Sequence, residues 1–145
     1  MQEVNFDEVV EQLVMQDPRF AREAYLFTRD ALGFTQKLIN RENKGTLRHN
    51  KEAHNHVTGQ ELLEGIRQFA LQQYGPMTMT VLEEWGVKSC RDFGDIVFNM
   101  VESTLLKKTE TDTRDDFQNG YDFTDAFRKP FWPQSKLAEK KPVAG

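Results

Sequence analysis

The chain of 145 residues has a single cysteine, few prolines and no long hydrophobic run. Because Cys90 is alone, no intrachain disulfide can form, which excludes a disulfide-stapled secreted scaffold. No apolar segment approaches the roughly 18 residues that a membrane helix needs. Residues 1–4 have neither the basic nor the apolar segment of a signal peptide. We therefore expect a cytoplasmic protein without a membrane partner.

The sequence also lacks the short motifs of common enzyme chemistry. It has no glycine-rich phosphate loop, no Walker pattern and no nucleophile elbow. Cys90 follows a predicted helix cap at Ser89, where a helix N-terminus can lower a thiol pKa, but no histidine lies near it in sequence. The acidic run 115–122 does not fit a calcium loop, because Phe117 and Ala126 stand where oxygen ligands are required. A thiol or metal-dependent enzyme is therefore the least favoured hypothesis.

The histidines gather in one polar stretch, as His49, His54 and His56. Imidazole clusters bind zinc or nickel, but a ligand pair on a helix needs a spacing of about four residues, and His49 and His54 do not have it. On an extended segment His54 and His56 could chelate a metal, which makes them weak candidates. A solvated loop with chance histidines is the favoured interpretation, and we predict no metal and no cofactor.

Apolar residues recur at helical spacing and predict about five helices in a single mainly α domain over residues 1–130. The first helix starts after an Asn5 cap and stops near Gln16. The pair Asp17-Pro18 then predicts the cap and first position of a second helix, which runs to about residue 40. A polar segment without periodicity, residues 36–57, is assigned to a loop.

Residues 57–109 read as three capped amphipathic helices joined by two short turns. Thr58 and Glu61 predict a capping box at the start of the first. Gly75-Pro76 and the segment 86–89 separate the three. Their predicted apolar faces are Leu62, Leu63, Ile66, Phe69, Ala70 and Tyr74, then Met77, Val81, Leu82 and Trp85, then Phe93, Ile96, Val97, Met100, Val101 and Leu105. This outline predicts helix-turn-helix-like packing.

Two arrangements fit the acidic segment that follows. Residues 105–109 could pair with residues 120–123 as a small β-hairpin, which would make the packing winged-helix-like. Alternatively, residues 112–117 and 124–128 form short helical turns. The Asp and Thr residues of this segment resemble helix caps and favour the turns slightly.

The C-terminal tail, residues 131–145, opens with two large aromatic residues between prolines, Phe131 and Trp132. The prolines predict an extended backbone here. Docking on the chain's own domain is the favoured interpretation of the two rings. Otherwise they form an anchor for a partner's groove, and they are the binding residues that the sequence suggests.

The net charge of −4 is unevenly distributed, with a basic loop at 31–57 and a basic tail at 128–145 around an acidic body. A recognition helix over 90–106 would present Arg91 and Asn99 to base edges, next to two aspartates that phosphate would repel. Binding of DNA is therefore less favoured than binding of a protein.

Several blocks of residues also occur in a specific order: Asp17-Pro18-Arg19-Phe20, Ala24-Tyr25, Thr58 to Arg67, Gly75-Pro76, Glu83 to Val87, Asp92 to Asn99, Asp116-Phe117 and Gly120 to Phe123. In these blocks the chain resembles a short bacterial family without assigned function, found mainly in planctomycetes and verrucomicrobia. The resemblance covers most of residues 17–130, and it implies no activity, cofactor or catalytic residue. The leading hypothesis is a non-catalytic protein-interaction or regulatory module, and the alternative is a winged-helix-like DNA-binding protein.

Overall fold

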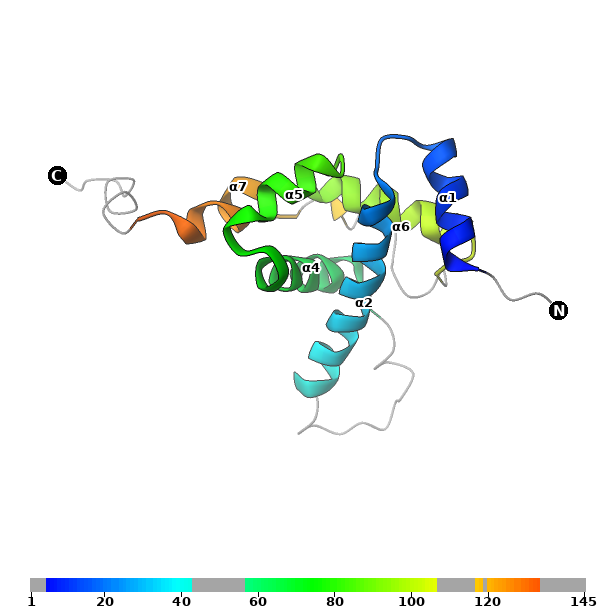
Figure 1. Cartoon of the computed structure of the whole chain (residues 1–145). Helices are drawn as coiled ribbons and strands as arrows, with labels where there is room; N and C mark the ends of the chain where they lie inside the picture. The colour runs from blue at the N-terminus through cyan, green and yellow to red at the C-terminus, as the bar shows by residue number, and fades with distance from the viewer. Residues whose placement is uncertain (1–4, 43–56, 107–116, 119, 134–145) are drawn as a thin grey trace.

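The computed structural model describes residues 5–42, 57–106, 117–118 and 120–133, and its regular elements are all helical (Figure 1). In chain order they are α1 (Phe6–Gln16), α2 (Arg22–Glu42), α4 (Gly59–Tyr74), the 3-10 turn η1 (Gly75–Met77), α5 (Thr78–Glu84), α6 (Cys90–Glu102), α7 (Phe123–Phe127) and the 3-10 turn η4 (Lys129–Phe131). No strand occurs in these described ranges, so the predicted mainly α class is confirmed. Helix-turn-helix packing stays a prediction.

Helix α1 has the predicted bounds. The Asn5 side chain accepts a hydrogen bond from the Glu8 N–H at 3.2 Å, as a helix cap does. Val10 and Leu13 are buried on its inner face. Local sequence signals were sufficient for this helix.

The predicted start of the second helix is wrong, because α2 begins at Arg22 rather than at Pro18. Asp17 ends α1 instead, and its backbone N–H donates to the Leu13 carbonyl at 2.8 Å. Its carboxylate accepts from Arg19, at 2.9 Å from Nε. The Asp17 side chain, which the sequence predicts to cap the second helix, is thus bound by the Arg19 guanidinium group.

Helix α2 ends at Glu42, close to the predicted helix end near residue 40, so the loop assigned to residues 36–57 starts too early. Leu32 and Thr35 are buried and Ile39 packs against the core, so the buried stripe extends beyond residue 36. Burial of that stripe stabilises the helix although the sequence there is polar. The rest of the loop, including the histidines, lies outside the described residues.

Helix α4 packs crosswise against α2, which is the most extensive contact between two helices in the described structure (Figure 1). Its capping box is confirmed, since Thr58 and Glu61 exchange hydrogen bonds of 3.0 Å in both directions. Gly65 faces Thr35 so closely that an added Cβ would lie 1.7 Å from the threonine Oγ1. The absent side chain therefore sets the distance between these helices.

Helix α6 buries the predicted face, with Phe93, Ile96, Val97 and Met100 in the core. Ser89 occupies the cap position, but its side chain makes no capping bond. Asp92 instead accepts from the Lys88 N–H at 2.8 Å. One predicted core position is wrong, because Met77 is 56% exposed in the turn η1.

Beyond α6, the short helical turn predicted at 124–128 is confirmed in substance by α7. The Asp122 carboxylate accepts from the Asp125 N–H at 3.2 Å and caps this helix. Phe123, a residue of the alternative hairpin, belongs to α7, and residues 120–122 form no strand. The other arm of the hairpin at 107–109 and most of the turn at 112–117 lie outside the described residues.

Candidate functional site

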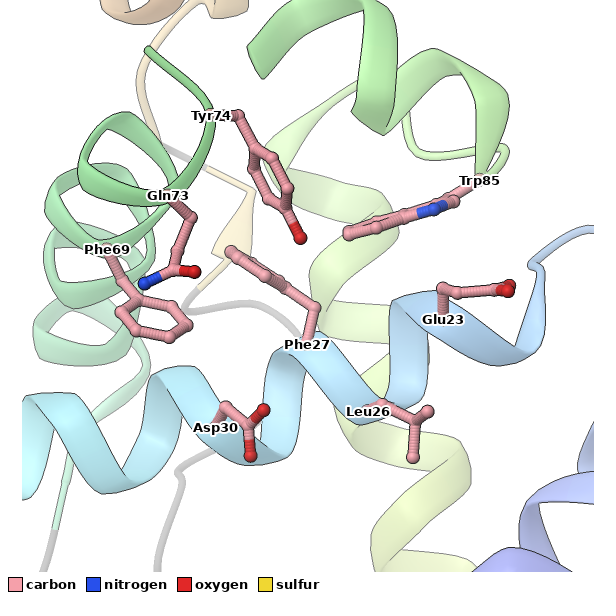
Figure 2. Close-up of a pocket in the computed structure, with 8 residues that line it drawn as sticks. All are labelled: Glu23, Leu26, Phe27, Asp30, Phe69, Gln73, Tyr74 and Trp85. Carbon is pink, nitrogen blue, oxygen red and sulfur yellow. The ribbon is translucent and has the colours of Figure 1, made fainter. Parts of the chain in front are cut away.

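A shallow groove of about 160 Å³ lies between α2, the end of α4 and the residue after α5 (Figure 2). We call it the aromatic groove. Its lining consists of Glu23, Leu26, Phe27, Asp30, Phe69, Gln73, Tyr74 and Trp85. Four of the eight lining residues are aromatic and two are acidic.

Helix α2 supplies the floor and the acidic rim. Glu23, Phe27 and Asp30 follow one another at helical spacings of four and three residues, which places them on one face of the helix. Phe27 is only 5% exposed and forms the floor, whereas both carboxylates are exposed. The groove therefore joins a buried ring to two charges at the water boundary.

The end of α4 forms the second wall, where Phe69 and Tyr74 are both half-buried. Helix α4 ends after Tyr74 because Gly75 has a positive φ of 52°, which residues other than glycine rarely adopt. The buried Thr78 hydroxyl donates to the Gly75 carbonyl at 2.7 Å and also reaches the Ala70 carbonyl at 3.2 Å. These bonds hold the turn, and with it the tyrosine.

Trp85 completes the groove from the C-terminal end of α5. The Val87 N–H donates to the Leu82 carbonyl at 2.9 Å and the Gly86 N–H to the Glu83 carbonyl at 3.0 Å, which is a Schellman motif. The Trp85 carbonyl accepts from the Ala21 N–H at 3.0 Å, just before α2. The backbone of Trp85 is thus fixed both to its own helix and to the helix across the groove.

The rings of the groove contact one another in defined geometries. Phe27 lies 5.4 Å from Phe69 and 5.5 Å from Trp85, measured between ring centroids. Tyr74 meets Trp85 edge to face at 5.8 Å and 83°. Ring pairs at these distances stabilise one another beyond their buried area. The walls are therefore largely ordered before any ligand arrives.

The groove carries negative charge. Burial raises the pKa of the Tyr74 hydroxyl, and the Asp30 carboxylate raises it further. That carboxylate also pairs with Arg29, whose Nε lies 3.2 Å from Oδ1. Glu23 makes no ion pair within the described part of the chain. A cation that enters the groove therefore meets two carboxylates. Glu23 has no ion pair within the described part of the chain, and Asp30 is paired with Arg29.

A separate polar network joins the segment before α2 to α6. The hydrogen bond from Arg19 lowers the pKa of the Asp17 carboxyl to about 2, against the opposing effect of burial. Arg19 also reaches Asp95 at 3.1 Å. The Asn99 amide donates to Asp17 and to the Tyr25 hydroxyl, at 3.1 Å each. The residue that sequence reasoning offered to DNA bases is therefore engaged within the fold.

Cys90 does not have the environment of an activated thiol. It is 4% exposed, and its Sγ donates to the Tyr121 carbonyl at 3.4 Å. Burial raises the pKa of the Cys90 thiol to about 11, although the residue opens α6. Desolvation therefore outweighs any effect of the helix N-terminus.

The binding residues suggested by the sequence lie at the C-terminal end of the described chain. Phe131 is 43% exposed, and Trp132 is half-buried, with the Lys129 Nζ 5.9 Å from its ring. The extended backbone predicted around them is wrong for Phe131, which ends the turn η4, and right for Trp132. These two residues are not part of the aromatic groove.

The weak metal candidates His54 and His56 lie outside the described residues. Within the ranges that are described, no cluster of histidine, cysteine and acidic side chains suits a metal ion. None of the described helices has the length and apolar character to cross a membrane.

Sequence reasoning missed the aromatic groove, although it placed Phe69, Tyr74 and Trp85 on the predicted apolar faces of their helices. Periodicity shows which face is apolar, but it cannot show that two helices leave part of that face uncovered. The repeated acidic and aromatic spacing along α2 was the available signal.

Comparisons with protein-family models, curated proteins and solved structures found no match to this chain. The resemblance to the bacterial family therefore stays a prediction.

Proposed function

We propose that this protein is a non-catalytic interaction module that binds another protein through the aromatic groove. The observation that carries the proposal is a preformed hollow that leaves Phe69, Tyr74 and Trp85 half-exposed. Tryptophan and tyrosine are enriched among the residues that dominate binding energy at protein interfaces. Tyrosine and tryptophan rings expose an apolar body together with a polar tip, which suits a surface that is exposed to water until a partner binds.

The size of the groove supports a side chain as its occupant. Pockets for small molecules and cofactors commonly enclose roughly 300–1,000 Å³ and bury most of the ligand. The aromatic groove, at about 160 Å³, is smaller and open. One anchoring side chain from a partner fits it better than a metabolite does.

The electrostatics support a protein in preference to DNA. Glu23 and Asp30 at the rim would repel phosphate groups. Asn99, the best candidate for reading bases, already donates to Asp17 and Tyr25. A winged-helix-like DNA-binding protein stays the alternative that the sequence suggests, and no contact in the described structure supports it. We further propose a cytoplasmic location, because small secreted domains commonly rely on disulfides and this chain has one cysteine.

Site-directed photocrosslinking tests the proposal. A photoreactive phenylalanine replaces Gln73 at the edge of the groove, and the matched control replaces Gln12, which is also exposed, on α1. Each protein is irradiated in a native lysate. We expect an adduct of defined mass with the first protein that is absent from the second.

A further variant connects any adduct to the groove. Trp85→Leu removes one wall, and we expect the Gln73 adduct to disappear while circular dichroism shows an intact helical fold. If Trp85→Leu does not fold, Tyr74→Leu is used in its place. Equal adducts at both positions, no adduct at all, or an adduct of two copies of this chain would each overturn the proposal.

A further inference from the structure

The aromatic groove combines two features that together select a charge type. Its floor is Phe27, its walls are Phe69, Tyr74 and Trp85, and its rim holds Glu23 and Asp30 (Figure 2). An aromatic ring attracts a cation to its negative face, and tryptophan does so best. Carboxylates add a longer-range attraction of the same sign. A neutral apolar group would use only the rings.

The arrangement also favours a cationic group over an anionic one. Tyr74 stands edge to face against Trp85, and Phe27 contacts both Phe69 and Trp85, so the four rings form one continuous aromatic surface built from three segments of the chain. A cation placed over the face of an aromatic ring is the contact used to recognise quaternary ammonium and methylated lysine.

We propose that the aromatic groove binds the ammonium end of a lysine side chain, methylated or unmodified, on the partner protein. This inference rests on the proposed function and specifies the chemistry of its ligand. The lysine stem contacts the rings, and the charged end lies between them and the Glu23 and Asp30 carboxylates.

The first measurement uses a small probe and one fluorophore. In a Trp132→Phe background, Trp85 is the only tryptophan of the chain. Tetramethylammonium chloride is titrated into this protein with sodium chloride held at equal ionic strength. We expect a saturable change of Trp85 emission, and about tenfold weaker binding of neopentyl alcohol, a neutral molecule of similar shape.

The second measurement uses short peptides that carry one trimethyllysine, one lysine or one neutral tert-butyl isostere. We expect both cationic peptides to bind at least about threefold more tightly than the isostere. Tighter binding of trimethyllysine than of lysine would assign the methylated form, and the reverse would assign the unmodified one.

Charge variants identify the rim. Glu23→Gln and Asp30→Asn should each weaken tetramethylammonium binding about two- to fivefold, and the larger effect is expected for Glu23. Glu102→Gln makes the same change of net charge at an exposed position that does not line the groove, and it should leave binding unchanged.

Equal affinity for the cationic and neutral probes overturns this inference, as does equal weakening by the Glu102→Gln control. If crosslinking from Gln73 is nevertheless observed, the proposed function holds and the partner binds the groove through a different chemistry. If the groove binds cations selectively but no partner is crosslinked, the ammonium site is supported and the protein-interaction role is overturned.

Discussion

Substitution of Gly65 by alanine tests how the fold is held together. A Cβ at this position would lie 1.7 Å from the Thr35 Oγ1, 2.8 Å from its Cβ and 3.0 Å from its Cγ2. Thr35 is buried, and its hydroxyl donates to the Ala31 carbonyl at 2.7 Å. Rotation of the threonine side chain cannot remove the contact with its Cβ. The helices α2 and α4 must therefore move apart at the centre of their interface.

Two opposing effects set the magnitude. Alanine is favoured over glycine inside a helix by about 1 kcal/mol. Overpacking of a well-packed core costs about 1–3 kcal/mol, and we expect the upper end because backbone has to shift. The net result for Gly65→Ala is a loss of about 2 kcal/mol in the free energy of unfolding. For a chain of this length, the midpoint of thermal unfolding should fall by roughly 6–8 °C.

Gly33→Ala is the matched control, because it makes the same substitution inside α2 where an added Cβ meets nothing within 4 Å. We expect it to stabilise the protein by about 0.5–1 kcal/mol. Urea unfolding followed by circular dichroism measures both variants. If Gly65→Ala stabilises the chain as much as Gly33→Ala does, the close approach of α2 and α4 is refuted. Thr35→Ala should recover part of the loss in the double variant, as a coupling of about 1 kcal/mol.

Three further predictions concern single sites. Gly86→Ala should destabilise the protein by at least about 2 kcal/mol in urea unfolding, because its φ is +87° and a Cβ would lie 2.0 Å from the Arg19 carbonyl oxygen; an unchanged midpoint would contradict this. The pKa of Asp17 is lowered to about 2 in the folded chain, so its carboxylate stabilises the fold above the unfolded pKa of about 3.9 and this contribution disappears as the pH falls through about 2. Asp17→Asn should cost about 1–2 kcal/mol at pH 7, and the difference from the unsubstituted protein should shrink towards pH 2 in acid titrations of stability. Cys90, with a pKa of about 11 and 4% exposure, should react with a disulfide reagent at pH 8 only as fast as the chain opens; labelling as fast as that of a free thiol would disprove its burial.

The positions that sequence reasoning predicted well depend on neighbours in the chain. Thr58 caps α4 through Glu61, three residues away, and Asn5 caps α1 through Glu8 in the same way. The start of α2 failed because the carboxylate of Asp17 is held by Arg19 and Asn99, and the second of these belongs to α6. A local sequence pattern cannot show that a residue of α6 binds the carboxylate that would otherwise cap α2.

The amino-acid sequence by itself determined the helical class, most helix ends and the buried stripes, because these follow from periodicity and from capping bonds within one turn. Only the tertiary structure decided that Gly65 admits Thr35 and that Glu23 stands at the rim of a hollow with Trp85. It also decided that burial outweighs the helix end at Cys90. Each of these depends on the distance between elements far apart in the chain, which the packing of whole helix faces sets.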